Sequence, residues 1–94
     1  MDTKWLGLKQ HRVIYDMLRQ NLTIRVSGCR VRELVDMDGD AVVEGISGRI
    51  IKDLHKRGIV TSVGKHDNGE ECYELSYAAK MKFSCGMYKQ ELTA

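Results

Sequence analysis

The stretch from Glu44 to Ser76 constrains the fold most, because a helical pattern stops at a glycine and a hairpin pattern follows directly. Gly58 suits the position after a helix, where a positive φ is needed, and Lys56 and Arg57 before it suit the negative end of the helix dipole. Apolar residues recur at spacings of three and four before this glycine, as on one face of a helix. They are Val43, Ile46, Ile50 and Leu54. The sequence therefore predicts a helix that ends just before Gly58.

Two runs of strand-forming residues follow the glycine. The run 59–63 is rich in β-branched residues, and the run 73–75 alternates apolar and polar residues. Asn68 and Gly69 lie between the runs, and this dipeptide favours the two-residue turns in which both central positions have positive φ. The pattern predicts a two-stranded hairpin.

This succession of helix, glycine and hairpin resembles the recognition helix and wing of the winged helix-turn-helix superfamily. The likeness lies in the segment "GRIIKDLHKRGIV", in which an apolar position, two polar positions, Leu54, three polar residues and then Gly58, Ile59 and Val60 follow in order. The resemblance implies an α+β winged helix-turn-helix fold. Such a fold has three helices, a C-terminal two-stranded wing and, here, a short terminal helix.

The rest of the chain is expected to supply the other parts of that fold. A helical pattern covers 8–21, and the alternating run 22–26 predicts a short strand of the kind that pairs beside the wing in many winged helices. The segment 29–37 predicts a second helix, for which Ser27 is a candidate cap. Its inward residues would be Val31, Leu34 and Val35.

The sequence leaves the start of the third helix open. Asp40 and Ser47 are both candidate N-caps, and Gly45 and Gly48 would each weaken a helix interior by about 1 kcal/mol. After the hairpin, the segment 77–94 predicts a short terminal helix. By analogy with other winged helices, this segment is a candidate dimerisation element.

Length, charge and hydropathy restrict the class of protein. The 94 residues suit one domain over 1–94, with 1–7 as a lead-in. Fifteen basic and thirteen acidic residues give a net charge of +2, so any DNA contact must come from local clustering of cations. No N-terminal apolar run is long enough for a signal peptide or a membrane span, which predicts a cytoplasmic protein with no membrane contact. Disulfides and a thiolate zinc site are not expected, because the cysteines are odd in number and widely separated: Cys29, Cys72 and Cys85.

The resemblance implies a DNA-binding transcriptional regulator, acting as a homodimer or with a second protein partner. The third helix, about 44–57, would enter the major groove, and the wing, 59–76, would lie on the backbone of double-stranded DNA. The helix would contribute Ser47, Arg49, Lys52 and Lys56, the wing Lys65 and His66, and the second helix Arg30 and Arg32. Among these, Arg49 and Lys52 are the best candidates for base contacts. No cofactor is expected.

An acidic cluster opposes this docking. It comprises Asp36, Asp38, Asp40 and Glu44. In a winged helix these carboxylates would lie at the end of the third helix that meets DNA, where they would repel phosphates. The alternative is a winged-helix protein interaction module, such as a small adaptor or inhibitor, that does not bind nucleic acid. An unbroken basic face would favour DNA, whereas acids that interrupt it beside an apolar patch would favour the interaction module. That face would need Arg49, Lys52, Lys56, Lys65 and one of Arg30 or Arg32.

The same acidic stretch superficially resembles a calcium loop. Its three aspartates occupy the first, third and fifth positions, but Ala41 stands where the loop needs glycine and Ser47 where it needs a bidentate glutamate, so no metal site is expected. Catalysis is not expected either. The sequence has no glycine-rich phosphate loop, no HExxH motif and no nucleophile elbow. Its histidines are scattered, at His11, His55 and His66.

Overall fold

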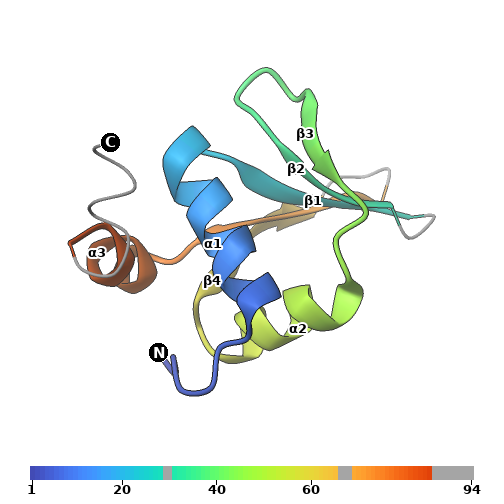
Figure 1. Cartoon of the computed structure of the whole chain (residues 1–94). Coiled ribbons are helices and arrows are strands. Elements are labelled where there is room, and N and C mark those ends of the chain that lie inside the picture. The colour runs from blue at the N-terminus through green and yellow to red at the C-terminus, as the bar shows by residue number, and fades with distance from the viewer. Residues whose placement is uncertain (29–30, 66–68, 86–94) are drawn as a thin grey trace.

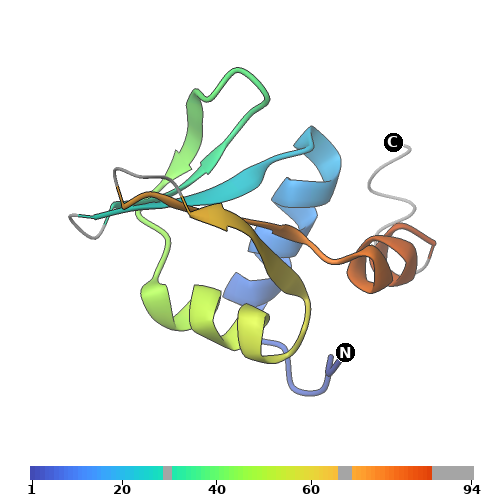
Figure 2. The ribbon, with the colours of Figure 1, turned by 180° about the vertical axis from the view of Figure 1, so that it is seen from behind.

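The computed structural model describes residues 1–28, 31–65 and 69–85, which form three helices and five strands. Their order is α1 (Leu8–Gln20), β1 (Thr23–Ser27), β2 (Val31–Val35), β3 (Ala41–Glu44), α2 (Gly48–Lys56), β4 (Val60–Lys65), β5 (Glu71–Leu75) and α3 (Tyr77–Cys85). The strands form one antiparallel sheet in the order β3-β2-β1-β5-β4 (Figures 1 and 2). The fold is α+β, as expected, but its layout differs from a winged helix-turn-helix.

The prediction of a second helix is wrong, and so is the prediction of a winged helix-turn-helix fold, which depended on it. The segment 29–37 contains β2, which pairs with β3 in a hairpin that was not expected from the sequence. The result is a five-stranded sheet instead of a helical core with a two-stranded wing. Apolar residues at 31, 34 and 35 fit a helix and a strand equally well over so short a run. The β-branched valines in both segments favour the strand.

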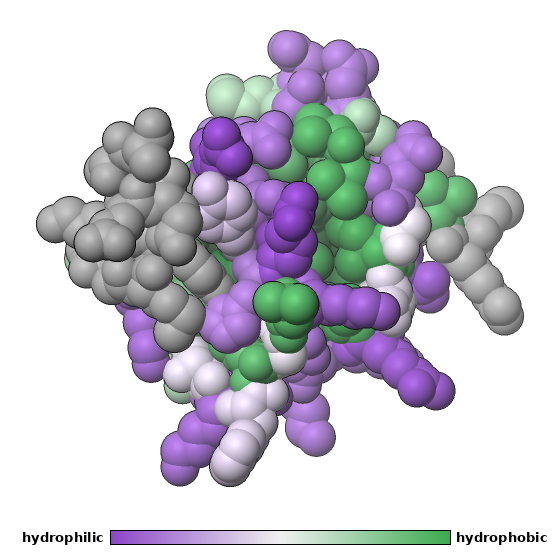
Figure 3. Space-filling view, in the orientation of Figure 1, coloured by the Kyte–Doolittle hydropathy of each residue, from purple (hydrophilic) through white to green (hydrophobic). Residues whose placement is uncertain are grey.

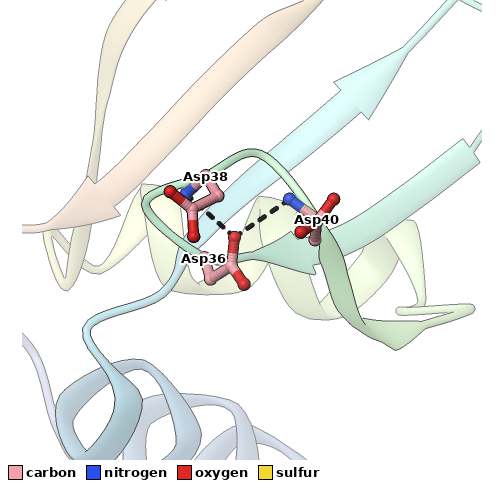
Figure 4. Close-up of side chains that lie close together, drawn as sticks. All are labelled: Asp36, Asp38 and Asp40. Carbon is pink, nitrogen blue, oxygen red and sulfur yellow. Dashed lines mark hydrogen bonds between the residues drawn. The ribbon is translucent and has the colours of Figure 1, made fainter.

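The turn between β2 and β3 is organised by Asp36. Its Oδ1 accepts hydrogen bonds from the backbone N–H of Asp38 at 2.9 Å and of Asp40 at 3.0 Å (Figure 4). Gly39 has a φ of 83°, which a glycine adopts without strain. Aspartate commonly bonds the backbone just ahead of it in turns. The aspartates that were expected to precede the third helix therefore build a hairpin turn.

Other expected elements are confirmed. The helix predicted over 8–21 is α1, and the strand predicted over 22–26 is β1, which pairs with β5 beside the predicted hairpin. That hairpin is β4 and β5. The short terminal helix is α3, and its Ala79 and Phe83 are buried in the core of the same chain.

The end of α2 at Gly58 is also confirmed. Gly58 has a φ of 77°, and its N–H donates to the carbonyl of His55 at 3.1 Å. The N–H of Ile59 donates to the carbonyl of Leu54 at 2.9 Å, which completes the double hydrogen bond of a Schellman motif. At the other end Ser47 is the N-cap, and its hydroxyl accepts from the N–H of Arg49 at 3.3 Å. Of the two candidate starts, the later one is therefore correct.

Both α1 and α2 pack against the same face of the sheet. The residues of that face form one row across the five strands: Val43, Leu34, Ile24, Tyr73 and Ser62. The helices bury Ile14 and Met17 from α1 and Ile51 and Leu54 from α2 against it. Full burial of such a side chain contributes about 1.5–3 kcal/mol. This packing fixes which side of α2 remains in solvent.

Candidate nucleic-acid interface

The outer side of α2 carries three exposed cations. Arg49, Lys52 and Lys56 are spaced by three and four residues, so they lie on one face of the helix, which we call the basic stripe. Ile51 and Leu54 are buried on the opposite side. Within the described residues, no ion pair includes a member of the stripe. The stripe therefore presents its charge to solvent.

The one acidic residue of α2 is already paired. Asp53 Oδ2 accepts from Arg57 Nε at 2.8 Å and from Gln10 Nε2 at 3.4 Å. Arg57 Nη1 also donates to the carbonyl of Lys4 and lies 3.9 Å from Oδ1 of Asp2. Arg57 therefore holds the N-terminal segment against the end of α2. Asp53 thus serves the packing of α2 and does not neutralise the stripe.

Arg32 lies apart from the basic stripe. It is half-buried on the face of β2 that α2 covers, and a Cβ added at Gly48 would lie 2.9 Å from its Nε. Gly48 therefore makes room for this guanidinium at the first turn of α2. Ser47 remains exposed beside it, although its hydroxyl caps the helix.

The remaining predicted contacts lie at the limits of the described chain. Arg30 and His66 fall outside the described residues, and Lys65 is the last residue of β4. The continuous face that the DNA hypothesis requires is therefore established for α2 alone.

The acidic cluster does not surround the start of α2 as the sequence suggested. The turn that holds Asp36, Asp38 and Asp40 lies at the far end of the β2–β3 hairpin, away from α2 (Figure 1). Arg25 Nη1 donates to the carbonyl of Gly39 at 3.2 Å and so ties this turn to the sheet. Only the fourth acid, Glu44, lies near α2. The main electrostatic objection to docking through α2 is thereby reduced to one carboxylate.

The three aspartates of this turn are close enough together to hold a metal ion. Carboxylate oxygens of Asp36, Asp38 and Asp40 all lie within 4.8 Å of one another (Figure 4). The hydrogen bonds that Asp36 accepts from the backbone of the turn are enough to explain why the three aspartates lie close together. Exposed acidic groups are also common without an ion. We assign no metal to it.

A pocket of about 260 Å³ lies beside α2, between α1, β3 and the β3–α2 connection. Its walls are mainly apolar, and Lys9 and Arg12 from α1 also line it. Glu44 of β3 lies opposite Glu33 of β2, so its side chain points to the other face of the sheet. We call it the apolar groove, and its wall residues are Val13, Val43, Ile46 and Ile50. Figure 3 shows the hydrophobic surface between α1 and β3 with hydrophilic side chains around it. The sequence did not predict this groove, because the segment 41–44 was expected to lead into the third helix or to begin it, and not to form a strand.

Tyr73 and His55 join α2 to β5. Their ring centroids lie 5.4 Å apart at an interplanar angle of 66°. Burial raises the pKa of the Tyr73 phenol above its ordinary value, and a hydrogen bond and the charge of Glu71 add to the shift. This contact supports α2 from the side of the sheet, away from the basic stripe.

Comparisons with protein-family models, with curated proteins and with solved structures gave no match for this chain. None of the helices in the described part of the chain has both the length and the apolar character needed to cross a membrane.

Proposed function

We propose that this protein binds double-stranded DNA through the basic stripe of α2. The observation that carries the proposal is the exposure of three cations on one helix face, with the only acid of that helix already paired. A protein gains most of its affinity for DNA from cations that replace counterions at the phosphates. The stripe offers three such cations on a rigid helix.

The dimensions of α2 suit a major groove. An α-helix with its side chains is about 10–12 Å across and fits a major groove that is about 12 Å wide, and the nine residues of α2 would extend about 13 Å along it. Arg49 lies in the first turn of α2, Lys52 in the middle and Lys56 at the last residue. In this proposal Arg49 and Lys52 contact base edges and Lys56 contacts a phosphate. Glu44 precedes the helix and disfavours an approach by the N-terminus alone. We therefore expect α2 to lie along the groove with its whole stripe engaged.

Binding to a pool of random 20-base-pair duplexes, measured by fluorescence anisotropy over a salt series, tests the proposal. The logarithm of the affinity should fall linearly with the logarithm of salt concentration, by about 0.9 for each phosphate contacted. The triple variant Arg49→Ala, Lys52→Ala, Lys56→Ala should flatten this slope by about 2–3. The matched control removes three exposed cations elsewhere: Lys4→Ala, Arg19→Ala and Lys80→Ala.

Three outcomes would contradict the proposal. The first is no binding of the wild-type protein at low salt. The second is an equal loss in both triple variants, because the effect would then reflect net charge and not the basic stripe. The third is tighter binding to duplex RNA of the same sequence, which would transfer the activity to another nucleic acid.

A further inference from the structure

The segment before α1 presents a tryptophan to solvent. We call residues 1–7 the N-terminal hook, and its Trp5 is 94% exposed, the highest value among the large apolar residues of the described chain. Trp5 also has a φ of 59°, in the left-handed region that a bulky residue rarely adopts. Leu6, the next residue, packs against the core. The backbone therefore turns at Trp5, so that Leu6 faces the core and the indole stays outside.

Contacts with two helices hold the N-terminal hook in place. Arg57 Nη1 at the end of α2 donates to the carbonyl of Lys4, and the N–H of Asp2 donates to the carbonyl of Arg57 at 3.0 Å. Lys82 Nζ of α3 donates to the hydroxyl of Thr3 at 3.0 Å. A strained residue persists only where the surrounding structure determines its conformation, and such residues concentrate at functional sites. The hook thus holds a tryptophan whose side chain lies outside the core.

These contacts place the indole at one end of the basic stripe. Arg57 directly follows Lys56, the last residue of the stripe, and lies eight residues after Arg49, on the same ridge of α2. Trp5 is the residue after Lys4, whose carbonyl Arg57 binds. The exposed indole is therefore tied to the end of α2 at which the stripe finishes.

The surroundings of the indole favour a nucleic acid as its partner. Asp2, the one acid of the hook, accepts the N–H of Lys4 at 2.9 Å and lies 3.9 Å from Arg57, so its charge is already countered. A lipid surface also attracts cations, but a protein that lies on a membrane needs an apolar face beside them. The exposed residues of α2 are all polar: Arg49, Lys52, His55 and Lys56. Phosphates with bases beside them suit this combination of cations and one aromatic side chain.

An exposed indole gains most from a nucleic acid when it stacks on a base. Such stacking tolerates any sequence, because every base has a π-face. Inside a continuous duplex both faces of each base are stacked on its neighbours, and opening a step costs free energy. An unpaired base beside a duplex offers its face at a lower cost. The DNA that engages both the basic stripe and the indole is therefore a duplex that borders a single strand.

We propose that this protein prefers DNA in which a duplex meets a single strand, with the basic stripe on the duplex and Trp5 stacked on the first unpaired base. The inference rests on the proposed binding of double-stranded DNA by the stripe, and it adds the form of DNA that is bound. Stacking should raise the affinity for such a junction over that for a continuous duplex by about 5- to 150-fold.

Anisotropy titrations of an intact duplex, and of the same duplex with a short single-stranded gap at its centre, test the preference. Both duplexes have the same ends, so stacking on a terminal base pair cancels. The wild type should bind the gapped duplex more tightly by the factor above. Trp5→Ala should bind the two duplexes equally and should bind the intact duplex as the wild type does.

Three further variants show whether the indole itself is responsible. Trp5→Gly should behave as Trp5→Ala, and because glycine adopts a φ of 59° without strain, a loss in this variant does not come from a disturbed hook. Trp5→Phe should keep most of the preference, because its ring still stacks. The matched control is Tyr77→Ala, at a 77% exposed aromatic residue of α3, which should keep all of it.

Fluorescence provides an independent check of the contact. Trp5 is the only tryptophan of the chain, so its emission reports on this indole alone. Stacking on a base should quench the emission when the gapped duplex binds, and the intact duplex should leave it unchanged. Vesicles of anionic phospholipid are the comparison for a membrane contact. Quenching by the gapped duplex, with loss of the preference in Trp5→Gly and not in Tyr77→Ala, would establish the inference.

The outcomes against it separate the two proposals. Equal affinity of the wild type for the two duplexes would overturn the junction preference and leave the binding of duplex DNA intact, as would a preference that Trp5→Gly retains. No binding of either duplex at low salt would overturn both proposals. A blue shift of the emission with anionic vesicles, and no response to the gapped duplex, would replace the base contact with a membrane contact.

Discussion

Arg25 on β1 and Glu33 on β2 lie directly opposite each other, and Nη2 of Arg25 is 2.5 Å from Oε1 of Glu33. Arg25 Nε donates to the same oxygen at 3.1 Å. Glu33 is only 8% exposed, and the hydrogen bonds that Arg25 donates to its carboxylate raise the pKa of Arg25. This pair lies on the face of the sheet that α1 and α2 leave uncovered, and the same Arg25 also reaches the β2–β3 turn.

Removal of Arg25 should destabilise the fold because it leaves a buried carboxylate without its partner. We expect Arg25→Ala to lower the free energy of unfolding by about 2–3 kcal/mol in urea titrations. The matched control is Arg12→Ala, which breaks a pair with Asp16 whose arginine side chain is 78% exposed and should cost less than about 0.5 kcal/mol. Similar losses in the two variants would mean that the burial of Glu33 does not strengthen its pairing.

The Schellman motif at the end of α2 gives a second prediction. Gly58→Ala should lower the free energy of unfolding by about 1–2 kcal/mol, because alanine is strained at a φ of 77°. Gly64→Ala is the control: this residue lies in β4, its φ is not in the left-handed region, and an added Cβ would meet no atom within 4 Å. We expect Gly64→Ala to be neutral or slightly stabilising in the same urea titration. A smaller loss at Gly58 than at Gly64 would contradict the role of the motif.

The raised pKa of Tyr73 predicts a loss of stability in alkali. The native state holds the phenolic proton more tightly than the unfolded chain, so the contribution is complete below about pH 10 and is lost as the pH rises through the native pKa. The difference in urea midpoint between the wild type and Tyr73→Phe should therefore stay constant below about pH 10 and shrink between about pH 10 and pH 12. Tyr77→Phe, at an exposed tyrosine of α3, is the matched control. A difference for Tyr73→Phe that stays constant over this range would refute the coupling.

Local chemistry explains which parts of the fold the sequence predicted. Gly58 is determined by a backbone conformation that few residues adopt, so the end of α2 and the following hairpin could be predicted from the residues alone. The segment 31–35 has no such marker, and its five residues fit two periodicities. Its pairing with β3 depends on the turn at Asp36. That turn can be recognised as a hairpin turn only when the segments on both sides of it are known to be strands. The resemblance to a winged helix then favoured the wrong alternative.

Part of the candidate site could likewise be predicted from the sequence, and part could not. The three cations of the basic stripe follow from helical spacing, and the structure places them together on the exposed side of α2. Arg32 was expected on a helix beside them, but it belongs to a strand and packs against Gly48. The apolar groove joins α1 to β3, two elements about 30 residues apart in sequence. Contacts of this kind depend on the tertiary fold, which local patterns do not specify.

Within the basic stripe, Arg49 and Lys56 should contribute differently to DNA recognition. A guanidinium can donate two hydrogen bonds to a guanine edge, and such a contact discriminates by about 1–3 kcal/mol. Once a preferred site has been selected from a duplex pool, Arg49→Ala should reduce the preference for it by about 5- to 150-fold. Lys56→Ala should weaken binding to all sequences alike and flatten the salt slope by about 1.

Arg49→Lys separates base reading from simple charge. It keeps the positive charge but loses the planar fork, so it should retain the salt slope of the wild type and still lose sequence preference. Anisotropy titrations of the preferred site and of a scrambled duplex, each at three salt concentrations, measure both quantities. If Arg49→Lys kept the full preference, or if Arg49→Ala and Lys56→Ala had equal effects on both duplexes, α2 would bind only the backbone. In that case the stripe would hold the protein on DNA without selecting a sequence.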